Sequence, residues 1–303
     1  MHKSNSMSAL CGRSRYPAMQ AASYVLLVII SLLIVYPYLL MFAASFTDNN
    51  SLVVRGYRLF SGDFSLDAYE YLWAKRVTFA RAYGITLFVT AGGTALSLLM
   101  TALFAYAISR SDFRGRRFLT FFIFFTMLFN GGFVSSYILW TNFINIKNTL
   151  WAYIIPNMLL NAMNVLIMKN YFKNNIPESV LESGKLDGAG EFRIFFRLVM
   201  PMALPISAAI GLLIALSFWN NWQNGLYFIK ATELYSYQNL LNRMIRDIQY
   251  LASEEGALAA NITFPGASIR MAIATLAVVP ILALYPFFKK YFIKGLTMGS
   301  VKE

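Results

Sequence analysis

The chain has 303 residues, of which 58% are hydrophobic and 13% are charged, and it carries a net charge of +12. Soluble domains average about 45 to 50% apolar and about 25% charged residues, so this composition indicates a polytopic membrane protein. The basic residues stand at the ends of apolar runs rather than in one patch, which argues against nucleic acid as a partner. Cys11 and His2 are the only cysteine and histidine, so a disulfide framework, a Cys/His metal site and a cysteine–histidine nucleophile pair are excluded.

Several apolar runs are long enough to cross a membrane as helices, because about 20 residues at 1.5 Å each span a hydrocarbon core of about 30 Å. Only a helix satisfies its own backbone hydrogen bonds in lipid. The predicted spans are residues 24–45, 83–108, 118–139, 150–168, 206–222 and 270–293. The first run is longer than the apolar region of a signal peptide, so we interpret it as an anchor.

The expected fold is therefore an all-α polytopic membrane protein with six transmembrane helices, forming one domain over residues 23–293. Lysine and arginine residues concentrate in the shorter connections, which places these connections, both tails (1–22 and 294–303) and the loop at 173–202 in the cytoplasm. The expected location is the plasma membrane, with a multi-pass topology.

Small residues recur at helical spacing along the run at 83–108. Such a stripe allows the backbones of two helices to approach closely, so tight packing within the subunit is favoured over the lining of a translocation path. The stripe consists of Thr86, Thr90, Gly93, Thr94, Ser97 and Thr101.

Two groups of polar residues are candidates for a translocation path. Asn157, Asn161 and Asn164 share one helical face and must point away from lipid, toward either neighbouring helices or a watery passage. At the outer end of the fifth run, aromatic rings and amides alternate, an arrangement that suits saccharides but is also typical of an interfacial anchor. The candidates there are Trp219, Asn220 and Asn224, within the sequence WNNWQN.

An amphipathic helix is expected in the last outer loop, where six apolar residues share a face: Leu240, Leu241, Met244, Ile245, Ile248 and Leu251. This helix could lie on the membrane surface or against a partner.

The cytoplasmic loop at 173–202 predicts two short helices joined by a turn. Pro177 suits the first turn of a helix that runs to Gly184, and Asp187 can cap a second helix. In that second helix Phe192, Phe195, Phe196 and Val199 stand at i, i+3, i+4 and i+7, and prolines then stop or bend it. The product is a helix at the membrane interface or a protrusion for a groove in a soluble partner.

The loop resembles the cytoplasmic signature of permease subunits in binding-protein-dependent ABC importers, with the type I permease fold. The residues that carry this resemblance are Glu182, Asp187, Gly188, Ala189, Pro201 and Pro205. Further blocks resemble the carbohydrate-uptake group, notably the polysaccharide-type permeases of Gram-positive bacteria: residues 125–132, 148–152, 218–220 and 294–302. Ser183 and Gly184 depart from the family, which usually has two alanines after the glutamate.

The resemblance implies that the loop is a coupling helix that docks on a cytoplasmic ATPase dimer. Glu182 would pair with a basic group, Gly188 would allow the tight turn, Ala189 would leave room, and Gly299, Ser300, Val301 and Lys302 would also contact the ATPase. The chain would bind no cofactor, because the ATPase holds ATP and Mg²⁺. Further implied partners are a second, different permease chain, an extracellular solute-binding protein, a saccharide substrate and the lipid bilayer.

Other functions fit the sequence less well. An ion-coupled secondary transporter, the main alternative, normally carries ionisable residues inside its spans, and these runs contain almost none. An enzyme would need a nucleophile with a base or paired carboxylates in the membrane, and the acids lie in the loops. The chain has no phosphate-binding loop, so the energy for transport must come from another subunit.

Overall fold

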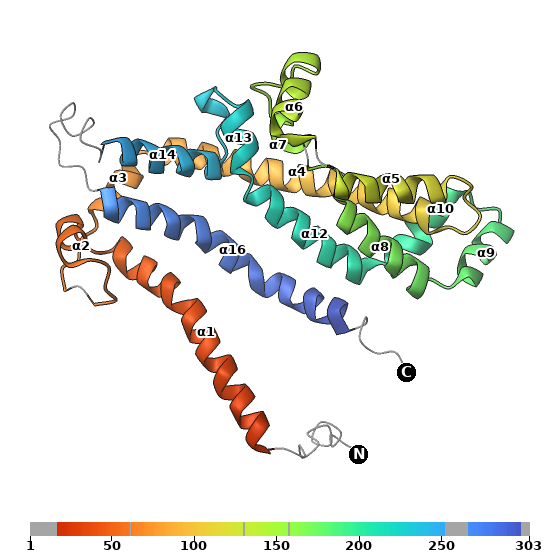
Figure 1. Ribbon diagram of the computed structural model, residues 1–303, viewed down its shortest axis with the longest axis horizontal. Helices are drawn as coiled ribbons and strands as arrows, with labels where there is room; N and C mark the ends of the chain where they lie inside the picture. Colours follow the sequence, from red (N-terminus) through yellow and green to blue (C-terminus); the bar gives the residue numbers. More distant parts are fainter. Residues whose placement is uncertain (1–16, 61, 130, 157, 252–265, 298–303) are drawn as a thin grey trace. The chain divides into compact units, whose positions relative to one another are not determined.

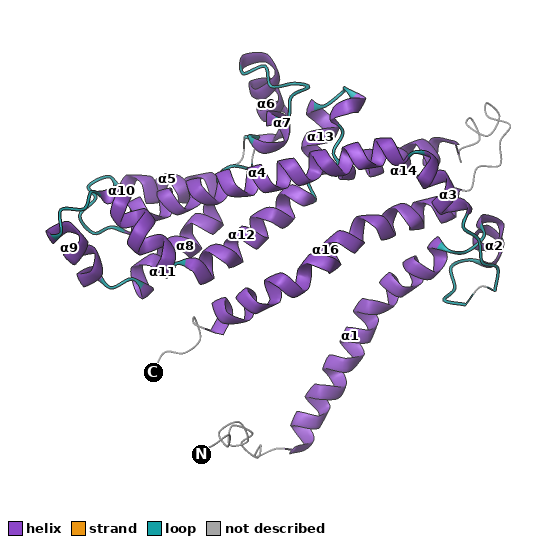
Figure 2. Cartoon of the chain, turned by 180° about the vertical axis from the view of Figure 1, so that it is seen from behind, coloured by secondary structure: helices purple, strands orange, loops and turns teal. Residues whose placement is uncertain are grey.

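The computed structural model describes residues 17–60, 62–129, 131–156, 158–251 and 266–297, and among these the regular elements are helices (Figures 1 and 2). The predicted all-α fold is confirmed for these residues. Contacts between residues divide the chain into two compact units. One unit contains Met1–Tyr71 and Thr263–Thr275, and the other contains Leu72–Ile262 and Leu276–Glu303.

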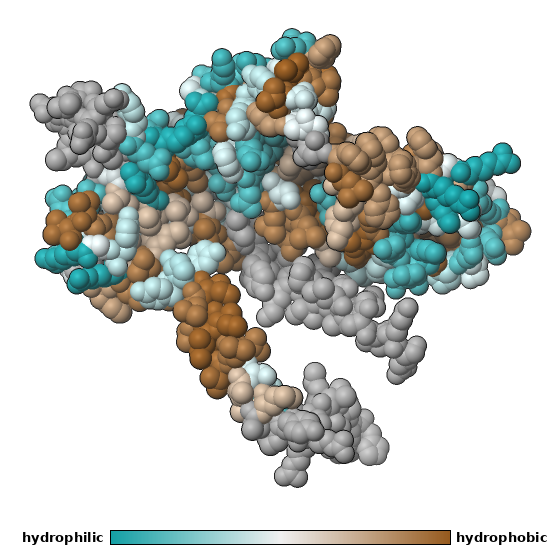
Figure 3. Space-filling model, viewed as in Figure 1, coloured by the Kyte–Doolittle hydropathy of each residue, from teal (hydrophilic) through white to brown (hydrophobic). Residues whose placement is uncertain are grey.

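In the first unit, α1 (Pro17–Ser45) is apolar and exposed along most of its length, as its hydrophobic surface in Figure 3 shows. A continuous apolar surface of this kind suits contact with lipid or another apolar partner. The Asp48 carboxylate caps α2 (Asn49–Arg55) by accepting from the amides of Asn50 and Ser51 at 2.9 and 3.1 Å. The Ala267 amide donates to Asn49 Oδ1 at 2.9 Å, which joins α2 to the first turn of α16 (Gly266–Thr297).

The second unit is organised around α4 (Arg76–Ser109), which packs along α12 (Leu204–Trp219) and α8 (Ala162–Asn175). Gly93 of α4 faces the ring of Phe218, and a Cβ placed on Gly93 would lie 2.6 Å from that ring. Ser97 Oγ donates to the Met158 carbonyl at 3.3 Å. The small-residue stripe of α4 therefore serves close packing within the subunit, as predicted.

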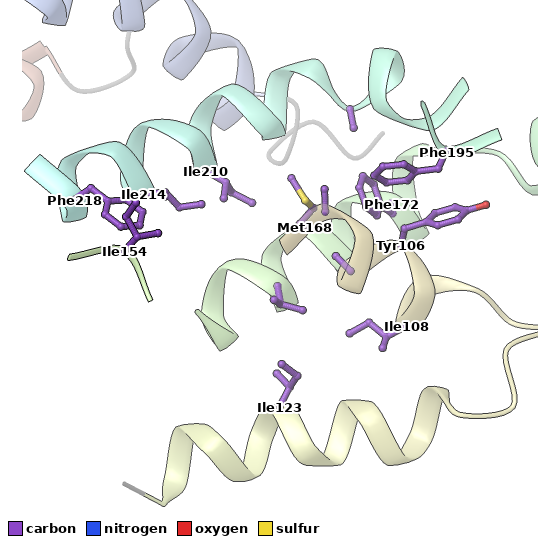
Figure 4. Packing of buried hydrophobic residues seen from close by; sticks show 14 of the residues in the cluster. Tyr106, Ile108, Ile123, Ile154, Met168, Phe172, Phe195, Ile210, Ile214 and Phe218 are labelled. Carbon is purple, nitrogen blue, oxygen red and sulfur yellow. The ribbon is translucent and has the colours of Figure 1, made fainter. Parts of the chain in front are cut away.

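Shorter helices complete this unit. They are α3 (Asp67–Ala74, which begins in the first unit), α5 (Arg116–Leu128), α6 (Gly132–Ile138), the π-helix η1 (Leu139–Phe143), α7 (Trp151–Ile154), α9 (Glu178–Leu186), α10 (Glu191–Ile194), the π-helix η2 (Phe195–Val199), α11 (Met200–Met202), α13 (Trp222–Phe228), the 3-10 helix η3 (Thr232–Leu234) and α14 (Tyr237–Leu251). Buried side chains from α4, α5, α8, η2 and α12 form the core, among them Tyr106, Ile123, Met168, Phe195 and Ile210 (Figure 4).

The predicted spans agree with the observed helices to different degrees. The runs at 24–45, 83–108 and 270–293 each lie within one helix, α1, α4 and α16. The run at 118–139 is divided between α5 and α6, which bend by 114°. Within the described part of the chain, 2 helices are long and apolar enough to span, or up to 4 if each bent pair counts as one span. Six crossings therefore remain a prediction.

Two of the predicted spans were wrong as continuous helices. The run at 150–168 is interrupted between Ile154 and Ala162, because Pro156 disfavours helix at the preceding residue and Asn161 caps α8 as a new helix. The run at 206–222 ends at Trp219, where Asn220 is the C-terminal cap, and the chain resumes as α13 at Trp222.

The amphipathic helix predicted around Leu240 and Leu241 is present as α14, which packs on α4 and α13 of the same chain. Leu241 is buried and Tyr237 is fully buried. The Tyr237 amide donates to Thr86 Oγ1 of α4 at 2.8 Å. Leu240, Met244 and Ile245 are half-buried, so the described part of this hydrophobic face is at least partly covered within the subunit.

Candidate functional site

The loop between α8 and α12 contains a helix, a tight turn and a second helix. Pro177 precedes α9, which ends at Leu186, and Gly188 then adopts a left-handed conformation with φ 75°. The Ala189 amide donates to the Gly184 carbonyl and the Gly188 amide donates to the Lys185 carbonyl, each at 3.0 Å. These two bonds form a Schellman motif, which requires positive φ at the position that glycine occupies here.

The second helix of the loop begins later than expected. Gly190 is the N-cap of α10, whereas Asp187, predicted to cap this helix, is the C-cap residue of α9. The prediction for Asp187 was wrong because the Schellman turn uses three more residues before the chain becomes helical again.

The apolar face predicted for the second helix is only partly correct. Phe195 and Val199 are buried, but the side chains of Phe192 and Phe196 are 74% and 52% exposed. The π-helix η2 begins at Phe195, so its wider turn affects the positions within and after it, including Phe196, and not Phe192. Ile194 is fully buried and completes the face that was predicted for Phe192.

The prolines bend the chain at the end of the loop, as predicted. Pro201 lies in α11 and Pro205 in the first turn of α12. The helical segment Glu191–Met202 meets Leu204–Trp219 at an angle of 85°. This bend is typical of prolines placed at the start of helices, because their nitrogen cannot donate a backbone hydrogen bond.

The tip of the loop presents a polar surface. Glu182, Ser183, Asp187 and Gly188 are exposed and Ala189 is half-buried. Gly184 is buried, and a Cβ there would lie 3.0 Å from Leu198 Cδ1 and 3.2 Å from Ile194 Cγ1. The glycine that departs from the family pattern therefore allows α9 to lie close against α10 and η2.

A cluster of charged residues at the base of the loop was not predicted from the sequence. Lys185 Nζ lies 2.7 Å from Asp112 Oδ2 and 3.2 Å from Glu191 Oε1. Arg110 donates to both carboxylate oxygens of Asp112, at 3.2 Å from Nε and 3.0 Å from the terminal nitrogen. The Tyr106 hydroxyl donates to Glu191 Oε2 at 2.7 Å. We call these five residues the Lys185 cluster.

The charges of the Lys185 cluster reinforce one another. The hydrogen bonds from Arg110 and then Lys185 hold the pKa of Asp112 well below its usual range. The hydrogen bond from Tyr106, with a smaller effect of Lys185, lowers the pKa of Glu191. The hydrogen bonds to Asp112 and then Glu191 raise the pKa of Lys185. All three groups are therefore charged at neutral pH.

The other end of α9 is tied to the same segment. Ser111 Oγ donates to Glu178 Oε1 at 2.7 Å. Glu178 lies in the first turn of α9 and Lys185 in its last turn. Both ends of the helix are thus connected to residues 111–112, directly after α4. The sequence carries only a weak signal for this arrangement, namely an isolated Asp112 in an arginine-rich segment.

An apolar cavity of about 490 Å³ lies beside the Lys185 cluster. Leu103, Phe113, Phe192 and Phe195 contribute apolar walls, and Tyr106, Arg110, Asp112 and Glu191 also line it. The cavity lies between the C-terminal end of α4 and the start of α10, where the rings of Tyr106 and Phe195 also pack together with centroids 5.3 Å apart.

The candidate path residues are divided between two helix breaks. The Asn161 side chain accepts from the Asn164 amide at 3.2 Å and so caps α8, and Asn161 is exposed while Asn164 is half-buried. Asn157 lies outside the described residues, as do the predicted tail contacts Gly299, Ser300, Val301 and Lys302.

Side-chain amides at the break between α12 and α13 reach the break between α7 and α8. Asn221 Nδ2 donates to the Tyr153 carbonyl at 3.2 Å, and Asn224 Nδ2 donates to the Pro156 carbonyl at 3.0 Å. Asn220 is exposed, and its Nδ2 donates to the Leu216 carbonyl at 3.0 Å. The amides near α13 therefore satisfy carbonyls that the break between α7 and α8 leaves without helical partners.

Trp219 is 5% exposed, so it is not positioned as an anchor at a membrane surface. Its Nε1 has no hydrogen-bond partner among the described residues. Trp222, three residues further on, is 38% exposed and is better placed for that role.

Comparison with known proteins identifies relatives over almost the full chain. A polygalacturonan/rhamnogalacturonan transport system permease protein, YtcP of Bacillus subtilis (strain 168), is 34% identical over 279 residues, which cover 92% of this chain and 96% of that protein. The protein LplC of the same organism is 34% identical over 268 residues, 88% of this chain and 89% of that one. Both matches therefore cover most of this chain and most of the relative.

A solved structure has the same fold. It belongs to a bacterial ABC transporter involved in the import of the acidic polysaccharide alginate, and the matched chain is 30% identical. The TM-score is 0.79, and the match covers 92% of this chain and 98% of that one. Residues 93–298 match the family model of the binding-protein-dependent transport system inner membrane component. The chain belongs to this family and is a permease subunit of an ABC importer with the type I permease fold.

Proposed function

We propose that this permease imports an oligosaccharide or a polysaccharide fragment that an extracellular solute-binding protein delivers. YtcP is a permease of a polygalacturonan/rhamnogalacturonan transport system, and the solved structure belongs to an alginate importer. Both match this chain along most of its length. The ion-coupled alternative receives no support from these comparisons.

We further propose that α9 and its Schellman turn are the docking site for the ATPase. The observation that carries this proposal is an exposed helical tip, with Glu182 and Asp187 at its surface, tied at both ends to the segment after α4. Two ATPase subunits bind ATP and Mg²⁺, and their closure moves α9. The permease has a second, different permease chain as its partner, and both of its termini face the cytoplasm.

Two substitutions at the exposed tip of the loop test the docking site. Glu182→Lys removes an exposed carboxylate, and Gly188→Trp puts a large side chain on a left-handed residue with open space around it. In the assembled transporter, both changes should lower co-purification of the ATPase and substrate uptake while membrane insertion is retained. Glu233→Lys makes the same charge change on an exposed residue of η3 and should leave both readouts unchanged. Normal uptake in both tip variants would refute the docking role.

We also propose that the translocation path for the saccharide passes the region around α13 and the break between α7 and α8. The residues proposed to line it are Asn161, Asn164, Trp219, Asn220 and Asn224. A buried indole with a free N–H and nearby amides can stack on sugar rings and bond to their hydroxyls.

Substrate-stimulated ATP hydrolysis tests the path. Asn220→Ala and Trp219→Phe should weaken this stimulation at unchanged basal hydrolysis, because they remove hydrogen-bonding groups and leave most of the packing. Ser217→Ala, which removes an exposed hydroxyl bonded to its own helix, is the control. Unchanged stimulation in both path variants would show that these residues have a packing role only.

A further inference from the structure

Lys185 connects three elements that the backbone alone joins loosely. Its ammonium group contacts Asp112, in the link after α4, and Glu191, the first residue of α10. Glu191 uses its other oxygen to accept from Tyr106 of α4. The contacts therefore form a closed ring that runs from α9 through Asp112 to α4 and returns through Glu191.

The backbone connections near this ring are short and not helical. The connection from α9 to α10 contains Gly188 and Gly190, and the connection from α4 to α5 is not helical between Arg110 and Gly115. A force on α9 would be absorbed in these connections if no side chains bridged them. The ring spans both connections, and it joins α9 to the helix on which α8 and α12 pack.

The chemistry of the ring suits a mechanical role. Arg110 meets Asp112 with two parallel hydrogen bonds, a geometry that fixes direction as well as distance. Isolated exposed ion pairs contribute little to stability, so an ionic ring on a partly exposed surface is better explained by positioning than by folding. Phe192 and Phe113 line the cavity beside the ring, so the polar contacts supplement the apolar packing of Tyr106 against Phe195.

We propose that Lys185 is a positioning residue that holds α9 rigidly against the cytoplasmic end of α4, so that movement of α9 reaches the transmembrane helices. This inference rests on the proposed docking of the ATPase at α9. It adds that force passes through the Lys185–Asp112 and Lys185–Glu191 contacts rather than through the backbone of the loop.

The first test uses the complete transporter in proteoliposomes, with both permeases, the ATPase and the binding protein. Lys185→Met should reduce the amount of substrate transported per ATP hydrolysed at least fivefold. Lys185→Arg, which keeps the positive charge, should retain most of the wild-type amount of substrate transported per ATP. Asp112→Asn should resemble Lys185→Met, and the double variant should be no worse than either single variant because both remove the same contact.

A matched control is Lys173→Met, which makes the same substitution on an exposed lysine at the end of α8. It should transport as wild type does. Wild-type transport per ATP in Lys185→Met would overturn the proposal. Loss of ATPase co-purification in Lys185→Met would also overturn it, because Lys185 would then act as a contact of the ATPase itself.

A second test uses the permease chain in membranes and does not depend on ATPase docking. Cys11→Ser removes the single cysteine, and spin labels are attached through Ser183→Cys on α9 and Arg117→Cys on α5, both exposed positions. The label-to-label distance distribution should widen at least twofold in Lys185→Met and stay narrow in Lys185→Arg and Lys173→Met. An unchanged width in Lys185→Met would refute the rigid connection. If the distribution widens in Lys185→Met but the wild-type permease does not bind the ATPase through α9, only the proposed docking would be refuted.

Discussion

The contact between Gly93 and Phe218 makes a quantitative prediction about the packing of α4 on α12. A Cβ at Gly93 would lie 2.6, 2.7 and 2.9 Å from three atoms of the Phe218 ring. Ordinary carbon contacts are about 3.5 to 4.0 Å, so the ring would have to retreat by about 1 Å. Phe218 is 3% exposed and lies beside Ile214 and Ile154 (Figure 4), which leaves little room for that movement.

Gly93→Ala should therefore destabilise the subunit through overpacking, which typically costs about 1 to 3 kcal/mol. The gain in helix propensity from glycine to alanine offsets about 1 kcal/mol of this. Gly92→Ala makes the same change at the neighbouring position, where a Cβ meets nothing within 4 Å. The propensity gain cancels between the two variants, so their difference isolates the steric cost.

The assay is thermal unfolding of the purified permease in one detergent, followed by tryptophan fluorescence. We expect Gly93→Ala to unfold at a lower temperature than Gly92→Ala. Adding Phe218→Leu to Gly93→Ala should reduce this difference in unfolding temperature. Equal unfolding temperatures for the two alanine variants would refute the close approach of α4 and α12 at this point.

Three further predictions follow from local geometry. Asn148 has φ 55°, and its Oδ1 accepts from the backbone amides of Lys230 and Ala231 at 2.6 and 3.2 Å. Asn148→Ala should therefore lower the unfolding temperature more than Asn148→Asp, because aspartate keeps the acceptor oxygen. A larger decrease for Asn148→Asp than for Asn148→Ala would contradict this role. A Cβ at Gly225 would lie 2.8 Å from the Cβ of buried Asn239, so Gly225→Ala should cost about 1 to 3 kcal/mol, measured in the same assay against Gly211→Ala, where the nearest atom is 3.5 Å away. Because Arg110 and Lys185 depress the pKa of Asp112, its contribution to stability is fully present above the usual aspartate pKa of about 3.9 and is lost as the pH falls through the depressed value. The difference in unfolding temperature between wild type and Asp112→Asn should thus be constant from about pH 5 to 8 and shrink below about pH 4, and a difference that changes around pH 7 would contradict the assignment.

The features that the sequence determined by itself are those with a local cause. The long apolar runs became α1, α4 and α16, because the length and composition of a run decide whether a helix can satisfy its backbone in lipid. The bend near Pro201 and Pro205 follows from the chemistry of proline at that position. The packing stripe of α4 was recognisable because helical spacing places its small residues on one face.

Other features depended on local geometry that single-residue patterns do not reveal. The start of α10 was missed because the Schellman turn delays it, and the exposure of Phe196 was missed because this residue lies in the π-helical turn of η2. The division of the run at 150–168 was also missed, since its apolar composition concealed the effect of Pro156 and the cap at Asn161.

The Lys185 cluster and the burial of Trp219 were decided only by the tertiary structure. Lys185 and Asp112 are 73 residues apart in the chain, and Tyr106 and Glu191 are 85 apart. Periodicity and composition describe neighbours within a few turns, whereas an ion pair requires that two distant segments meet at about 3 Å. That meeting depends on how α4, α8 and α12 pack together, because their packing brings the end of α4 to the loop that carries α9.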